Sequence, residues 1–132
     1  MARLLASVAL TLSVTSSNGT NQQSHVMDYE TFCQLPRVGR MTALRQISRE
    51  NTGDLIRTHA QRWTDANRAR LTATQLRFMQ EFIATVPPMF REAHTAENYP
   101  RLRFVEQGLR QFFSSTDVSE IFPLDQADCV KR

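Results

Sequence analysis

The chain has 132 residues, of which 41% are hydrophobic and 22% charged, a composition typical of one globular domain and not of a disordered chain. Its net charge of +3 is too small to indicate the clustered basic face that nucleic-acid binding requires, so we expect no nucleic-acid partner. The basic residues are fifteen arginines and Lys131. We attribute this bias mainly to genome composition, and the alternative is selection for forked contacts to carboxylate or phosphate.

Residues 1–17 have the pattern of an export signal. Arg3 gives the positive start, residues 4–14 are largely apolar, and residues 14–16 offer small side chains at the usual cleavage spacing. The apolar stretch is shorter than the ~20 residues that a membrane-spanning helix needs. We therefore expect a signal peptide and a secreted or periplasmic protein. A mis-assigned start codon or a short buried helix is the alternative.

Residues 18–27 are polar and lack periodicity, which predicts a flexible leader. We expect residues 28–132 to form one all-α domain, a small bundle of four to five helices, because β-branched residues are sparse and scattered.

The first two predicted helices meet at a proline. The first covers Asp28–Leu35 and ends at Pro36, which fits the first turn of the next helix. The second covers Arg37–Ile47. Its apolar residues fall three apart and predict one buried stripe, made of Val38, Met41, Leu44 and Ile47.

The third predicted helix starts after Asn51, with Asn51 or Thr52 as its cap, and ends before Leu71. Its apolar face consists of Leu55, Ile56, His59 and Trp63. Three charged residues of the same helix fall off this face, namely Arg57, Arg62 and Asp65.

The fourth predicted helix has the clearest start, because Thr72 and Gln75 have the spacing of a capping box and Leu71 can pack on Leu76. We expect the Pro87-Pro88 pair to interrupt it, with a short helical piece after the interruption. The predicted inner face is Leu76, Met79, Phe82, Ile83 and Val86.

The fifth predicted helix opens at Pro100 and mixes basic with aromatic residues. We expect an ordinary core-facing helix with a solvated basic side. The alternative is a surface for another protein or peptide, or for an anionic membrane, formed by Arg101, Arg103, Phe104 and Arg110. A last helical turn covers Asp117–Phe122, and the tail after it is polar and expected to be loose unless Cys129 tethers it.

The two cysteines, Cys33 and Cys129, lie near the two ends of the predicted domain. In an oxidising compartment they are candidates for one internal disulfide. Free thiols, or bonds to other chains, are the alternatives.

No catalytic signature is present. The chain lacks GxSxG and HExxH patterns, its glycines do not cluster, and no cysteine–histidine spacing fits zinc. We interpret His59 as a hydrogen-bonded histidine at the edge of the core. We expect a non-enzymatic protein with no cofactor and no metal.

Scattered residues over positions 30–125 resemble the bacteriocin fulvocin C-related proteins. They are Phe32, Leu35-Pro36, Arg40, Gly53-Asp54-Leu55, Arg57, His59, Leu71-Thr72, Gln75, Asp117 and Glu120-Ile121-Phe122. The family implies an exported bacterial protein with a cysteine-rich segment after the helical region. The sequence stops at Arg132, where that segment would begin, so the resemblance implies a leader, carrier or self-protection module and carries over no antibacterial activity.

The run Leu71-Thr72-Ala73-Thr74-Gln75 is also similar to the motif of the LTxxQ family of periplasmic helical chaperones and stress sensors. That resemblance implies binding of unfolded proteins on a basic and apolar surface.

Overall fold

A computed structural model describes residues 26–92 and 103–131, so residues 1–17 and all but two residues of the expected leader lie outside it. The described residues contain six α-helices and no strand, which confirms the all-α fold class. The helices are α1 Tyr29–Gln34, α2 Arg37–Gln46, α3 Arg49–Asn67, α4 Ala73–Glu92, α5 Arg103–Phe112 and α6 Ser115–Ile121.

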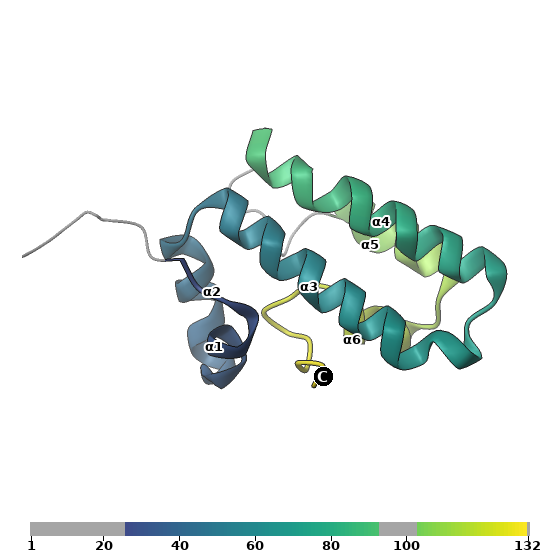
Figure 1. Cartoon of the computed structure of the whole chain (residues 1–132), viewed down its shortest axis with the longest axis horizontal. Coiled ribbons are helices and arrows are strands. Elements are labelled where there is room, and N and C mark those ends of the chain that lie inside the picture. The colour runs from purple at the N-terminus through teal and green to yellow at the C-terminus, as the bar shows by residue number, and fades with distance from the viewer. Residues whose placement is uncertain (1–25, 93–102, 132) are drawn as a thin grey trace, which may run out of the picture.

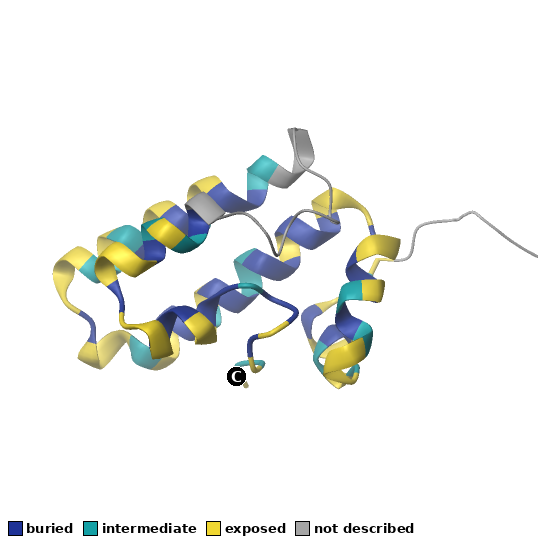
Figure 2. Ribbon diagram, turned by 180° about the vertical axis from the view of Figure 1, so that it is seen from behind, coloured by how far each residue is buried: buried dark blue, intermediate teal, exposed yellow. Residues whose placement is uncertain are grey.

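Helix α3 is the central element of the bundle (Figure 1). Helix α4 lies along its length, and α1 and α6 also contact it, while α5 packs against α4 and α6. Figure 2 shows that the buried residues face inward between these helices. The arrangement follows from α3's sequence pattern, since the predicted face of Leu55, Ile56, His59 and Trp63 is buried in every position.

Aromatic rings fill the core between α3, α4, α5 and the segment after α6. The rings of Trp63 and Phe113 meet edge to face with centroids 5.7 Å apart, and Phe82 and Phe122 do so at 6.5 Å. Such geometry is favourable beyond the area that the rings bury. Trp63 also donates from its indole nitrogen to the Glu120 carboxylate at 2.9 Å, which ties α3 to α6.

The start of α3 differs from the prediction. Ser48 is the cap, and its side chain accepts from the backbone N–H of Asn51 at 3.0 Å. The side chain of Asn51 instead bonds both the N–H and the carbonyl of Met27, at 2.7 and 2.9 Å. Asn51 and Thr52 therefore lie inside the helix, and Met27, assigned above to the flexible leader, is fixed to α3.

The expectation that Pro87-Pro88 interrupts the fourth helix is wrong, because α4 continues through both prolines to Glu92. Proline lacks the N–H that a helix interior uses, so the carbonyls one turn earlier lose their partners. Packing offsets this loss, since Val86 and Pro87 are buried and the Pro87 backbone lies directly against Gly53 of α3.

The predicted stripe of α2 is correct only in part. Leu44 and Ile47 are buried, but Val38 is 92% exposed. Arg40 takes its place on the inner face and is only 7% exposed. Its guanidinium stacks over the Phe32 ring at 5.4 Å and donates to the Ala127 carbonyl at 2.9 Å. The buried face of α2 is therefore set by the C-terminal tail that Arg40 holds.

The tail, residues 123–131, turns back under α3 and lies between α6 and the α1–α2 pair (Figure 1). Leu124, Asp125 and Ala127 are buried, and Cys129 is bonded to Cys33. The tail is thus a packed part of the domain, as expected for the case in which Cys129 tethers it.

Candidate functional site

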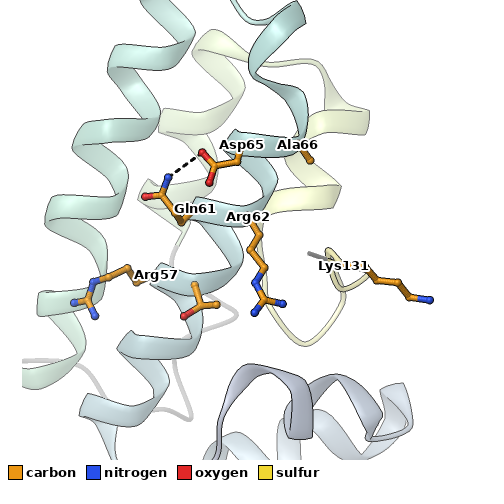
Figure 3. A pocket seen from close by; sticks show the side chains of 7 residues that line it. Arg57, Gln61, Arg62, Asp65, Ala66 and Lys131 are labelled. Atoms are coloured by element: carbon orange, nitrogen blue, oxygen red, sulfur yellow. Dashed lines mark hydrogen bonds between the residues drawn. The ribbon is translucent and has the colours of Figure 1, made fainter.

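An open groove of about 660 Å³ lies along the outer face of α3 (Figure 3). Its lining comes from one helix and one tail residue, and consists of Arg57, Thr58, Gln61, Arg62, Asp65, Ala66 and Lys131. The six helical positions recur three or four apart, opposite the buried face of α3. The amphipathic pattern that builds the core therefore also builds the groove.

Arg62 is the most buried cation of this α3 groove, with a side chain that is only 15% exposed. Its guanidinium lies 4.7 Å from the centre of the Tyr29 ring, forms an ion pair with Glu30 and donates to the Val130 carbonyl at 3.4 Å. The hydrogen bond from Arg62 lowers the pKa of the Glu30 carboxyl below its usual value. Arg62 therefore joins α3 to both α1 and the tail.

The other charged groups of the α3 groove are more exposed. Arg57 donates to Asp54 at 2.7 Å, and Asp65 accepts from Gln61 at 3.2 Å. In Figure 3 the side chains of Arg57 and Lys131 point to opposite sides, with Arg62 between them. The groove thus carries cationic groups on both of its sides.

Behind the groove, His59 is almost completely buried and its two ring nitrogens are both hydrogen-bonded. Nε2 lies 2.8 Å from the Glu120 carbonyl, which can only accept, so Nε2 carries the proton. Nδ1 then accepts from the Tyr29 hydroxyl at 2.6 Å, and that hydroxyl accepts from the N–H of Val130 at 2.9 Å. Burial lowers the pKa of His59, and the nearby positive charge of Arg40 acts in the same direction.

This network fixes the neutral histidine between α1, α6 and the tail and leaves it no free nitrogen for a substrate. It agrees with the interpretation of His59 as a hydrogen-bonded core-edge residue. His25 and His94 lie outside the described residues. The carboxylates of Asp28 and Glu30 have different partners. Asp28 caps α1 by accepting from the Thr31 N–H, and Glu30 forms an ion pair with Arg62.

The candidate disulfide is confirmed. Cys33 and Cys129 are joined with an S–S distance of 2.07 Å and a Cα–Cα distance of 5.9 Å, across a separation of 96 residues. Disulfides persist in oxidising compartments, so the bond fits a protein that functions outside the reducing cytoplasm.

The predicted capping box is also confirmed. Gln75 accepts from the Thr72 N–H at 2.9 Å, and Thr72 accepts from the Gln75 N–H at 3.1 Å. The Gln75 amide also donates to the Phe112 carbonyl at 2.9 Å, which ties the start of α4 to the end of α5. These residues therefore have a structural role at a helix start.

The predicted partner surface lies largely outside the part of the chain that the structure describes. Arg101 lies outside the described residues, and Arg103 and Phe104 are the first two residues of α5. Arg110 is exposed and lines a separate hollow of about 300 Å³ near α6. The sequence did not lead us to predict the α3 groove. The signal for it was that Arg57, Arg62 and Asp65 all fall off the apolar face of the helix.

Among the described residues, no group of three or more histidine, cysteine, aspartate or glutamate side chains is placed to hold a metal ion. None of the described helices is long and apolar enough to cross a membrane. No protein-family model, curated protein or solved structure matches the chain.

Proposed function

We propose that the chain is an exported, non-enzymatic helical protein that binds another protein or peptide in the α3 groove. The observation that carries this proposal is the pairing of a disulfide-closed core with an open, charged groove on its central helix. The buried titratable pair of Tyr29 and His59 is fully used inside the fold, which favours recognition over catalysis.

The pattern of residues 1–17 and the disulfide support export independently of each other. The first is a targeting pattern, and the second needs an oxidising compartment to persist. A secreted or periplasmic location of the mature protein satisfies both.

The resemblance to the bacteriocin fulvocin C-related proteins agrees with this proposal, because it implies an exported helical portion that acts as a leader, carrier or self-protection module. The LTxxQ resemblance receives less support. Thr72 and Gln75, which carry that motif, bond to each other and to α5, so the start of α4 accounts for them without a client protein.

Export is tested by mass spectrometry of the protein recovered, without reduction, from its host. We expect a chain that begins near Ser17 and has both cysteines oxidised. Recovery of the chain with Met1 and two alkylatable thiols from the cytosolic fraction would contradict the export proposal.

The binding role is tested by placing a photo-crosslinking amino acid at Ala66, which is exposed and lines the groove, in the exported chain. The matched control is Ala84, which is exposed on α4 outside the groove. We expect a discrete protein adduct at Ala66 and none at Ala84. Equal adducts at both positions, or none at either, would contradict groove binding.

A further inference from the structure

We propose that the α3 groove takes a short, extended peptide segment that carries carboxylates. This inference rests on the proposed function, because it names the class of partner that the groove recognises.

The tail, residues 123–131, shows how arginines of this protein hold a chain segment by its main-chain carbonyls. Arg37 donates to the Gln126 carbonyl at 2.8 Å, Arg40 to the Ala127 carbonyl at 2.9 Å and Arg62 to the Val130 carbonyl at 3.4 Å. Arg37 also pairs with the Asp128 carboxylate. Three arginines of α2 and α3 thus bind main-chain carbonyls and one acidic side chain of residues 123–131, the recognition that planar guanidinium groups favour.

The α3 groove continues the surface on which the tail lies. Arg62 bonds the tail at Val130 and also lines the groove, and Lys131, the next tail residue, forms part of its wall. From Arg57 to Ala66 the helix rises about 13 Å. That length matches about four residues of extended chain. A short extended segment therefore has room beside the tail.

The charges favour carboxylates as the occupant's side chains. Three cations line the α3 groove, while its lining carboxylate, Asp65, is already bonded to Gln61 and Arg68. Arg57 is held by an exposed pair with Asp54, and such pairs contribute little and exchange easily. Arg57 and Lys131, on the two sides of the half-buried Arg62, are therefore able to pair with acidic side chains of a peptide (Figure 3). Nucleic acid fits less well, because the cations of the groove are few.

The test is fluorescence anisotropy of labelled probes on the oxidised, full-length mature protein. The probes are a short peptide of alternating aspartate and alanine, the same peptide with asparagine in place of aspartate, and a single-stranded oligothymidylate. We expect the aspartate peptide to bind, with an affinity that falls as salt rises, and the asparagine peptide and the oligothymidylate not to bind. Equal binding of the two peptides, or stronger binding of the oligothymidylate, would overturn the proposal.

The variants are Arg57→Gln and Lys131→Gln, and the control is Arg77→Gln, an exposed arginine of α4 outside the groove. Each groove variant should weaken the aspartate peptide about threefold, the effect of losing one exposed ion pair. Arg77→Gln should leave the affinity unchanged. An equal loss in all three variants would indicate a general charge effect and would also overturn the proposal.

The failure of this inference is distinguishable from failure of the proposed function. If the crosslinker at Ala66 traps a discrete partner but the aspartate peptide does not bind, the carboxylate inference is wrong and the binding role stands. If neither is observed, both are wrong.

Discussion

Gly39 and Gly53 form a matched pair of positions at which the same substitution should have opposite effects. Both glycines are helical, Gly39 in α2 and Gly53 in α3. A Cβ added at Gly39 meets no atom within 4 Å, whereas one added at Gly53 lies 2.8 Å from the Pro87 carbonyl oxygen. The two sites therefore separate the intrinsic benefit of alanine in a helix from the cost of a steric clash.

Gly39→Ala should stabilise the protein by about 0.5–1 kcal/mol, because alanine loses less backbone entropy than glycine in a helix. Gly53→Ala has the same intrinsic benefit, but the new methyl would contact three backbone atoms of Pro87, at 2.8, 3.4 and 3.5 Å. Backbone cannot move aside as a flexible side chain does, and overpacking of this kind costs about 1–3 kcal/mol. We expect Gly53→Ala to be destabilising by about 1–2 kcal/mol net.

The measurement is urea unfolding of the oxidised proteins, followed by circular dichroism at 222 nm or by the fluorescence of Trp63. The unfolding free energy should rise from Gly53→Ala through the wild type to Gly39→Ala. Stability of Gly53→Ala equal to or above that of the wild type would refute the close α3–α4 approach. A loss of stability in Gly39→Ala would refute the open space described at that position.

Three further predictions concern the disulfide, the buried histidine and the helix cap. Replacing Cys33 and Cys129 by alanine should lower the unfolding free energy by about 4–5 kcal/mol in the chain-entropy model, given the separation of 96 residues, and an unchanged urea midpoint would contradict this. The pKa of His59 in the folded protein lies below its ordinary 6.5, so as the pH falls the unfolded chain binds the proton before the folded protein does. The contribution of the neutral ring to the unfolding free energy is therefore complete above pH 6.5 and is lost as the pH falls toward the folded pKa. An NMR titration of the imidazole should therefore give a midpoint below 6.5, and one at or above that value would be inconsistent with the buried neutral ring. Thr72→Ala should cost about 1 kcal/mol and the exposed neighbour Thr74→Ala close to nothing, as measured by the same unfolding assay, and equal losses would argue against the capping bond.

The sequence predicted the helices because the residues that determine a helix cap or a buried helix face lie within a few positions of one another. The capping box at Thr72 and Gln75 was recognisable, since both partners of its hydrogen bonds are three residues apart. The buried face of α3 was recognisable for the same reason. The Ser48 cap was open to the same logic, but Asn51 is an equally good capping residue, and only its bonds to Met27 exclude it.

The remaining errors came from contacts between distant segments. Arg40 is buried because a carbonyl 87 residues away accepts its hydrogen bond, and nothing in its neighbourhood of the sequence indicates this. The prolines of α4 remain helical because α3 supplies a glycine where the two backbones meet. The α3 groove depends on the same long-range order, since Lys131 reaches it only when the tail lies against α1 and α3.

The bond between Cys33 and Cys129 also bears on how the protein is made and how it survives. Cys129 is translated only after nearly all of the helical domain, so the disulfide cannot form until the tail has left the ribosome. Once closed, a single protease cut in any of the connections between the two cysteines leaves the pieces as one molecule. Separation of the pieces then requires a reductant as well as a protease.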